Sequence, residues 1–372
     1  MSNSKDLASG ILAEIDVRVG GTRPWDLHVH NDAFYGRVIA EGALGLGESY
    51  MDRWWDCEQI DELLFRLIRN DLKQHVKVGW SMITLLLRDK LVNRQARGHR
   101  AEEVGRRHYD IGNDLFQAML DKRMTYSCAY WEGADNLDQA QENKLDLVCR
   151  KLGLEPGMRV LEIGCGWGSF AKFAAEKYGV NVLAINNSKE QVALGKKMCA
   201  GLSVEIRFQD YREVEGTFDR IVSIAMFENV GPRNYRTFMQ VVNDRMIDDG
   251  LCLLHTIGAK KPNKKPDAWS DKYIFPRGML PTIAQMGKAM EGLLMVEDWH
   301  NMAINYEKTL LVWHENFEAA WPALEAKYGD RFYRMWRYYL LSMAGAFRAR
   351  SNQVWQIVMA KEGILGGYKS VR

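Results

Sequence analysis

A long hydrophobic run is the first feature that this sequence lacks. Crossing a bilayer takes about 20 apolar residues, and the longest apolar stretch, residues 80–87, is far shorter. The first residues, Met-Ser-Asn-Ser-Lys-Asp, do not show the charged and then apolar pattern of a secretory signal. We therefore expect a cytoplasmic protein, for which any contact with a membrane would be peripheral.

The sequence also has few cysteines and a small net charge. The chain has six cysteines among 372 residues, and none forms a C-x-x-C pair or completes a zinc spacing with a nearby histidine. This pattern predicts a reducing compartment and no structural metal. The formal net charge of +2 does not indicate a nucleic-acid partner. Internal repeats and low-complexity segments are absent from the sequence, so a repeat architecture is not expected.

A stretch rich in glycine organises the rest of the chain. An apolar strand at 160–163 leads directly into Gly164, Gly166 and Gly168, and a helix follows at about 169–178. Glycine permits a tight turn and lets a ligand lie against the backbone. The G-x-G-x-G spacing differs from the dinucleotide motif and from a phosphate loop. Taken alone, it also fits a glycine-rich turn in some other α/β protein.

An acid stands immediately before this turn. Glu162 would repel a pyrophosphate group but suits a cationic ligand. S-adenosylmethionine carries a sulfonium and an ammonium group. The sequence therefore indicates this cofactor for Glu162 and for the turn formed by Gly164, Cys165, Gly166 and Gly168.

Strands alternate with helices along the second part of the chain. The alternation predicts an α/β fold with a doubly wound, mostly parallel sheet of seven strands. The expected strands are 160–163, 181–185, 204–209, 218–224, 251–257, 294–298 and 354–359, and the expected helices are 137–152, 169–178, 188–198, 235–246, 306–321 and 332–347.

The first part of the chain has a different pattern. Residues 1–91 predict a smaller, mainly helical domain, a basic linker follows at 92–107, and residues 108–372 make up the second domain. The expected elements of the first domain are helices at 7–17, 34–40, 60–68 and 76–87, a short strand at 25–29 and a glycine-punctuated loop at 41–50.

Polar residues follow the strands where a doubly wound sheet binds ligands. Gln209 and Asp210 come after the third strand and suit the adenine edge of the cofactor. Asn186 and Gln191 come after the second strand and suit the ribose hydroxyls. Each of these residues, taken alone, also fits a polar loop position or a helix cap, and we expect Ser188 to be such a cap.

An acid and a histidine follow two neighbouring apolar runs. Glu228 and His255 each follow an apolar run and are expected to end the fourth and fifth strands, so we expect both at the rim of the sheet, facing the cleft. A lone histidine there is more often structural than catalytic. An acid and a histidine on adjacent strand ends indicate a catalytic site.

Basic and aromatic residues suggest a membrane surface. Arginines and lysines gather at 88–107 with few acids against them, which fits either a solvated linker or contact with anionic headgroups. Trp54, Trp55 and Trp80 favour the second interpretation, so we expect the first domain to dock on a bilayer. Because no aromatics are interleaved with the basic run, nucleic acid is not an expected partner.

Eight motifs together give the chain a more specific resemblance. They are Gly45-Leu-Gly-Glu-Ser-Tyr-Met-Asp52, His108-Tyr-Asp110, Tyr126-Ser-Cys-Ala-Tyr-Trp131, Leu161-Glu-Ile-Gly-Cys-Gly-Trp-Gly168, Met226-Phe-Glu228, Leu254-His-Thr-Ile257, Asp271-Lys-Tyr-Ile-Phe-Pro276 and Gly345-Ala-Phe-Arg-Ala-Arg350. They span nearly the whole length. The chain resembles the bacterial cyclopropane-fatty-acyl-phospholipid synthases and the related mycolic acid cyclopropane synthases.

The resemblance implies a reaction. The cis double bond of an acyl chain, still in its phospholipid, takes a methyl group from S-adenosylmethionine. The resulting carbocation loses a proton from the new methyl group, and the ring closes. The base implied by the resemblance is a bound bicarbonate ion, held by Cys128, Glu228, His255, Tyr306 and the backbone N–H of Ile257. Cys128 equally fits a small buried apolar residue.

The resemblance also implies a fold and partners. It implies the class I methyltransferase, Rossmann-like fold, a homodimer, and peripheral association with the inner face of the cell membrane. The cofactor contacts it implies are Tyr126, Ser127, Glu162 to Gly168, and Gln191.

The sequence departs from the family pattern at three positions. Asn229 stands where the family usually has histidine, and Asn186 stands where it usually has threonine. Met343 stands where many members have a cysteine in a C-terminal helix. A thioether cannot act as a thiolate, so we expect no cysteine nucleophile from that helix.

Two other functions remain open at this point. One is an acyl-chain methyltransferase that leaves a methyl branch, which shares the first chemical step. The other is a lipid-binding protein without catalysis, although Glu162, Glu228, His255 and Tyr306 argue against it.

Overall fold

The computed structural model describes residues 2–70, 111–263 and 265–372. They divide into two compact units. Unit 1 comprises Met1–Met119, Lys265–Arg277 and Leu310–Ser351, and unit 2 comprises Leu120–Lys264, Gly278–Thr309 and Asn352–Arg372. The sequence pattern did not indicate that the two later segments of unit 1 group with the N-terminal residues.

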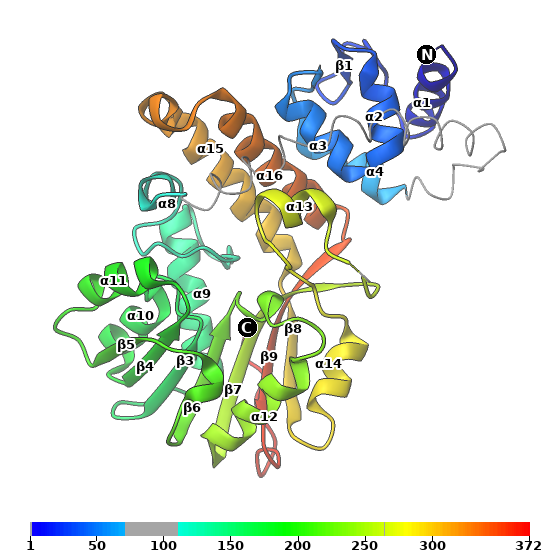
Figure 1. The fold of residues 1–372 in the computed structure, drawn as a ribbon. Helices are drawn as coiled ribbons and strands as arrows, with labels where there is room; N and C mark the ends of the chain where they lie inside the picture. Colours follow the sequence, from blue (N-terminus) through cyan, green and yellow to red (C-terminus); the bar gives the residue numbers. More distant parts are fainter. Residues whose placement is uncertain (1, 71–110, 264) are drawn as a thin grey trace. The chain divides into compact units, whose positions relative to one another are not determined.

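Unit 2 is built on a seven-stranded sheet with the order β5-β4-β3-β6-β7-β9-β8 (Figure 1). Its strands are β3 Arg159–Ile163, β4 Asn181–Asn186, β5 Val204–Phe208, β6 Phe218–Ile224, β7 Met246–Ala259, β8 Met295–Asn301 and β9 Asn352–Ala360. The strands from β5 to β7 pair in parallel, and β9 is antiparallel to both of its neighbours. The predicted mostly parallel, seven-stranded sheet is thus confirmed.

Helices cover both faces of this sheet (Figure 1). Apolar side chains of α9 Leu137–Lys151, α10 Ser169–Tyr178 and α11 Lys189–Met198 form one core with the sheet. Those of α12 Tyr235–Arg245 and α14 Ile283–Met290 form a second core on the other face. Three of these helices, α9, α11 and α14, begin at capped residues, since Asn136, Ser188 and Thr282 each accept a hydrogen bond from the backbone at N3. The prediction that Ser188 is a cap is confirmed.

Unit 1 is mainly helical, as predicted. Its elements are α1 Ser2–Glu14, β1 His28–Val29, α2 Ala33–Glu41, α3 Ala43–Met51, β2 Trp55–Asp56, α4 Ile60–Arg69, α8 Asn113–Met119, α13 Ala268–Tyr273 and α16 Asp330–Arg348, and the long helix α15 Ala303–Tyr328 has residues in both units.

The predicted loop at 41–50 is wrong, because α3 occupies it. Gly42 has a φ of +59° and separates α2 from α3. The next two glycines serve close packing instead of turns. A Cβ on Gly45 would lie 2.5 Å from the carbonyl oxygen of Arg37, and one on Gly47 would lie 2.3 Å from the indole of Trp269. Glycine spacing alone does not distinguish a turn from such a helix contact.

The two neighbouring tryptophans of unit 1 are not both available to a lipid surface. Trp55 is fully buried, and its indole N–H donates to the Leu46 carbonyl and to Ser49 Oγ at 3.1 Å each. Trp54 is half-buried under the guanidinium of Arg37. Trp55 therefore does not support the expected docking on a bilayer, because its ring belongs to the core.

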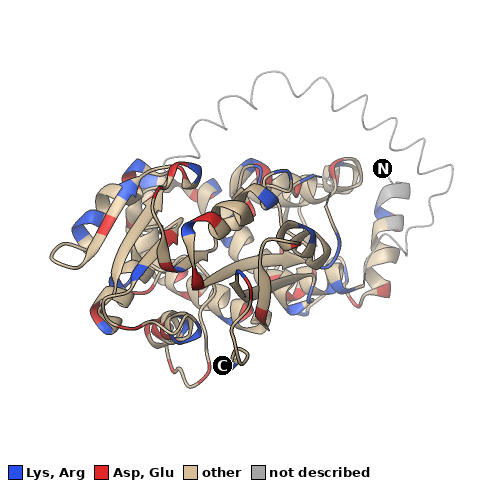
Figure 2. Cartoon of the chain, turned by 90° about the horizontal axis from the view of Figure 1, so that it is seen from below, with Lys and Arg blue, Asp and Glu red and all other residues tan. Residues whose placement is uncertain are grey.

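Several predictions fall on residues that the structure does not describe. They are Trp80, the helix at 76–87, the basic run at 88–107 with both domain boundaries, and the motif that begins at His108. In the described parts, basic and acidic residues are interspersed (Figure 2). No helix in residues 2–70, 111–263 and 265–372 is both long and apolar enough to span a bilayer.

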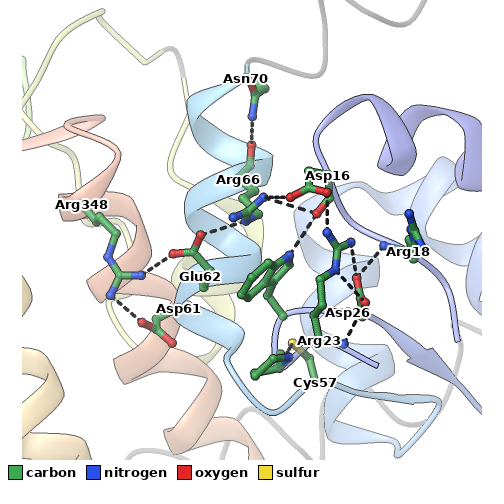
Figure 3. Close-up of polar contacts among 12 residues, drawn as sticks. Asp16, Arg18, Arg23, Asp26, Cys57, Asp61, Glu62, Arg66, Asn70 and Arg348 are labelled. Carbon is green, nitrogen blue, oxygen red and sulfur yellow. Dashed lines mark hydrogen bonds and ion pairs between the residues drawn. The ribbon is translucent and has the colours of Figure 1, made fainter. Parts of the chain in front are cut away.

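Ion pairs join the elements of unit 1 around α4 (Figure 3). Arg66 on α4 binds Asp16 and Glu62 at 2.8 Å each. Arg348 on α16 binds Asp61 at 2.6 Å and Glu62 at 2.8 Å. The two pairs of Arg348 join α16 to α4, and the pair of Arg66 with Asp16 joins α4 to the segment that follows α1.

The contact between α16 and α4 generates a stability prediction. A Cβ on Gly345 would lie 2.4 Å from the Asp61 carbonyl oxygen, a backbone atom that cannot move aside cheaply. We expect Gly345→Ala to lower the free energy of unfolding by about 1–3 kcal/mol, measured by urea titration. Gly287→Ala is the matched control, since that helical glycine has no heavy atom within 4 Å of its Cβ position. The control should be neutral or raise stability by roughly 0.5–1 kcal/mol, and equal losses would contradict the packing argument.

Candidate functional site

The glycine turn after β3 exposes backbone at the edge of the sheet. Gly164, Gly166 and Gly168 have φ values of +85°, +54° and +86°, a region that favours glycine. The N–H groups of Gly164 and Cys165 donate to the Ile185 carbonyl at 2.9 and 3.1 Å. A Cβ on Gly166 would meet no atom within 4 Å. The turn is thus fixed to β4, while Gly166 leaves room for a ligand.

Glu162 lies directly beneath this turn. Its side chain is buried, and Oε2 accepts a hydrogen bond of 3.1 Å from the backbone N–H of Ala171 on α10. Burial raises the pKa of Glu162 to about 8, although that N–H and the charge of Lys144 act in the opposite direction. A cationic ligand above it would favour the ionised form.

The residues predicted to hold the ribose lie together. Asn186 Nδ2 donates to the Gly166 carbonyl at 3.0 Å and to Gln191 Oε1 at 2.8 Å. The backbone N–H of Gln209 donates to the Asn186 carbonyl at 3.2 Å. The carboxylate of Asp210 is held by Arg212 at 2.6 Å. An amide can donate twice, so Asn186 makes both contacts where a threonine hydroxyl could donate only once.

The segment that carries Ser127 and Cys128 is anchored from two sides. Gln141 on α9 donates to the Thr125 and Ser127 carbonyls at 3.3 and 2.9 Å. Lys144, also on α9, donates to Ser127 Oγ at 2.9 Å. All five side chains are buried. The predicted cofactor residue Ser127 is therefore held by a buried lysine.

Helix α15 holds the other end of this segment. Thr309 Oγ1 accepts hydrogen bonds from the Ala129 N–H at 3.2 Å and from the Trp131 indole at 3.0 Å. Asn305 Oδ1 accepts one from the Trp131 N–H at 2.8 Å. Tyr306, which is 7% exposed, lies between these two anchors on α15. The contacts bring the segment of Cys128 to the turn of helix that carries Tyr306.

Glu228 and His255 are near neighbours in the fold, but neither ends its strand as predicted. His255 lies inside β7, which continues to Ala259, and pairs with Ile224, the last residue of β6. Glu228 lies four residues beyond β6, in the 3-10 helix η3 Phe227–Asn229. Strand β6 ends four residues before Glu228, and β7 continues four residues beyond His255, so the apolar runs in the sequence did not mark the ends of these strands.

A short hydrogen bond links Glu228 to β7. Glu228 Oε1 accepts a hydrogen bond of 2.6 Å from the backbone N–H of Ile257, two residues beyond His255. Its other oxygen, Oε2, is buried and has no hydrogen-bond partner in the described part of the chain. An orphaned buried oxygen is costly unless a ligand or water meets it. The neighbouring Asn229 is exposed, so its departure from the family pattern lies outside this buried group.

Burial sets the charge of these groups. It raises the pKa of the Glu228 carboxyl and lowers that of His255 well below its usual value, with the charges of Lys144, Lys151 and His300 adding to the second effect. Burial also raises the pKa of the Cys128 thiol, whose Sγ donates to the Ala129 carbonyl at 3.3 Å. His255 is thus neutral, and Cys128 is not a thiolate.

Lys144 and Gln141 were missed by sequence reasoning. A signal was available, because both lie on the buried face of α9 with Leu137, Ala140, Leu145 and Val148 at helical spacing. A lysine on such a face is rare unless a partner holds it. In residues 2–70, 111–263 and 265–372, no group of histidine, cysteine and acidic side chains could hold a metal ion.

The fold and this turn define a class of protein. The sheet, its flanking helices and the glycine turn after β3 are those of the class I S-adenosylmethionine-dependent methyltransferases. A structure of the cyclopropane synthase MmaA2 from Mycobacterium tuberculosis is 31% identical, with a TM-score of 0.64 over 70% of this chain and 98% of that one. A structure of mycolic acid cyclopropane synthase CmaA1, complexed with SAH and CTAB, is 32% identical, with a TM-score of 0.65 over the same shares.

Sequence comparison narrows the class to a family. Residues 96–357 match the family model for mycolic acid cyclopropane synthetase. The cyclopropane-fatty-acyl-phospholipid synthase of Escherichia coli is 46% identical over 366 residues, which cover 98% of this chain and 95% of that protein. The chain belongs to the cyclopropane synthase family, and the resemblance seen in the motifs is confirmed.

The raised pKa of Glu162 predicts an inverted pH dependence of stability. In the folded protein this carboxyl keeps its proton up to about pH 8, whereas in the unfolded chain it loses the proton near its ordinary value. The stability that it contributes is therefore fully present at low pH and falls between about pH 4.5 and 8. Relative to Glu162→Gln, the wild type should lose stability over that window in urea titrations and level off above it.

Glu155→Gln is the control for this comparison. Glu155 is exposed in the turn before β3, so its variant should follow the wild type at every pH. A constant difference in stability between wild type and Glu162→Gln from pH 5 to 9 would contradict a protonated, buried Glu162.

Proposed function

We propose that the protein transfers a methylene unit from S-adenosylmethionine to the cis double bond of an unsaturated phospholipid acyl chain, giving a cyclopropane fatty acyl phospholipid. The observation that carries the proposal is the buried pair of Glu228 and the Ile257 N–H on the strand of His255, with one carboxyl oxygen left unpaired. The kinship with cyclopropane-fatty-acyl-phospholipid synthases supports the substrate class.

The cofactor would lie over the glycine turn. When bound, S-adenosylmethionine supplies the methyl group. The buried carboxyl of Glu162 and the open backbone at Gly166 suit its cationic amino-acid end. The residues that would hold the cofactor are Tyr126, Ser127, Glu162, Gly164, Cys165, Gly166, Gly168, Asn186, Gln191, Gln209 and Asp210.

A small anion would complete the reaction site. When bound, bicarbonate supplies the base that the last proton transfer needs. The residues that would hold it are Cys128, Glu228, His255, Tyr306 and the N–H of Ile257, which also binds Glu228. The unpaired Oε2 of Glu228 fits this role, since its raised pKa favours a protonated oxygen that can donate.

The side chains around this site suit a carbocation. The double bond needs no activating base, but it must be held in line with the methyl group. Cys128, His255 and Tyr306 are at most 7% exposed, and exclusion of water prevents capture of the cation as an alcohol. The face of Tyr306 could stabilise the cation by roughly 0.5–2 kcal/mol.

We also infer a membrane role for the N-terminal part. Residues 1–91 would form a lipid-binding domain, and the basic linker at 92–107 would touch anionic headgroups from the cytoplasmic side. The basic run in the sequence supports this, at about 1 kcal/mol per residue near an anionic surface. A homodimer is proposed on family kinship alone. The membrane role would be contradicted if binding of the protein to vesicles, measured by flotation, depended on neither the anionic lipid content nor the salt concentration.

A direct assay tests the proposed function. The purified protein is given S-adenosylmethionine and vesicles of a monounsaturated phospholipid, and the acyl chains are analysed by gas chromatography with mass spectrometry. We expect a product one methylene heavier that resists hydrogenation, because a ring contains no double bond. A product that hydrogenates to a branched chain would instead indicate the methyl-branch reaction. Cofactor binding without any product from several lipids would favour a lipid-binding protein.

Glu228→Gln tests the carboxyl within the same assay. Glutamine keeps an acceptor for the Ile257 N–H but replaces the O–H that the carboxyl would offer to the ion with a weaker N–H donor, so turnover should fall by roughly tenfold or more with little change in cofactor affinity. The exposed Glu155→Gln should keep wild-type turnover. Full activity of Glu228→Gln would remove this carboxyl from the mechanism.

Lys144→Met tests the anchor beneath the cofactor. The variant loses the hydrogen bond to Ser127 Oγ and the positive charge near Glu162. We expect binding of S-adenosylmethionine to weaken roughly tenfold by isothermal titration, equivalent to about 1.4 kcal/mol, with unchanged folding by circular dichroism. The exposed Lys122→Met is the matched control. Unchanged affinity in Lys144→Met would make this lysine a packing residue only.

A further inference from the structure

A row of polar side chains crosses the sheet at the level of His255. In the antiparallel pairing of β7 with β9, His255 lies opposite Gln356, and in the pairing of β9 with β8, Gln356 lies opposite His300. Residues directly opposite each other project from the same face of a sheet. Gln356 is fully buried, and His255 is 1% exposed. The row therefore runs inside the protein, from His255 toward the edge strand.

Gln356 touches His255 through its amide nitrogen. The distance from Gln356 Nε2 to His255 Nδ1 is 3.3 Å. An amide nitrogen can only donate, so Nδ1 must accept, and the ring proton must then lie on Nε2. A protonated imidazole would place two donors against each other at this contact. With the amide in this orientation, which leaves Gln356 Oε1 without a hydrogen-bond partner in the described residues, the imidazolium and the other neutral tautomer of His255 are both excluded.

The surroundings of the row agree with a neutral ring. Lys151 on α9 is fully buried, and its Nζ lies 3.0 Å from His300 Nδ1 and 3.6 Å from the carboxylate of Asp298. Asp298 is also bound by Arg372 at 2.7 Å. The buried positive charges of Lys151 and Lys144 on α9 therefore oppose protonation of His255.

We propose that Gln356 is a positioning residue that holds His255 in the tautomer protonated at Nε2. His255 then offers an N–H, not a lone pair, to the group bound between it and Glu228. In the proposed reaction this makes His255 a donor to the anion that accepts the proton, and it excludes His255 itself as the base. The tautomer rests on the contact alone, whereas its catalytic consequence rests on the proposed function.

The test combines spectroscopy with kinetics on the full chain. Proteins labelled with 15N-histidine are compared by NMR, and the His255 signals are assigned by their loss in His255→Asn. In the wild type we expect an unprotonated Nδ1 and a protonated Nε2. Gln356→Glu places an acceptor at the same position, so Nδ1 should gain the proton. Its kcat should fall roughly tenfold or more, with KM for S-adenosylmethionine within about twofold of the wild type.

Two further variants keep the outcome decisive. Gln356→Leu removes the donor without adding a charge, and it should yield a mixture of tautomers and an intermediate kcat. Gln353→Glu, on the same strand but outside the row, should change neither signal nor rate. A wild-type His255 protonated at Nδ1, or a Gln356→Glu variant with full kcat, would overturn the proposal. The expected tautomer in a wild type without any turnover would support the contact and overturn the proposed function.

Discussion

The site depends most on the register of β9 between β7 and β8. That register sets Gln356 beside His255 and His300, and it packs Trp355 against Gly258, where a Cβ would lie 2.2 Å from the indole. A slip of one residue would turn Gln356 into the opposite core and bring Trp355 toward the polar row. The indole of Trp355 fits only against a glycine, so its contact with Gly258 fixes the register of β9. The same register places Gln356, on the other face of the sheet, opposite His255.

Buried charge is the second constraint on this half of the molecule. Lys144 and Lys151 lie seven residues apart on α9, on its buried face, and burial lowers the pKa of each to about 8. Such cations are costly in a core. They also create a positive potential beneath His255 and Glu162. An anion between Glu228 and His255 would be attracted by that potential, whereas a protonated His255 would be repelled, so one arrangement of charge favours both the neutral imidazole and a bound anion.

Local sequence pattern predicted the regular elements and turns that depend on neighbouring residues. It failed where a position is determined by contacts between residues that are distant in sequence. The glycine turn, the strand alternation and the cap at Ser188 all follow from neighbouring residues, and the structure has them. The helix at Ala43–Met51 was missed because two of its glycines, Gly45 and Gly47, are required by close packing against Arg37 and Trp269. Trp55 looked like a surface aromatic because nothing near it in sequence shows its burial. Gln356 gave no signal at all, since its importance comes from a partner about a hundred residues away.

The departures from the family pattern acquire a physical meaning in this structure. Asn229 is exposed at the end of η3, while Glu228 beside it is buried and bound to β7. The usual histidine would therefore face outward at this position, and its loss leaves the buried carboxyl and its hydrogen bond intact. Asn186 replaces a hydroxyl with an amide that joins Gly166 to Gln191. Both substitutions preserve the groups nearest the proposed chemistry, whereas an equally small change at Gln356 would alter which nitrogen of His255 carries the proton.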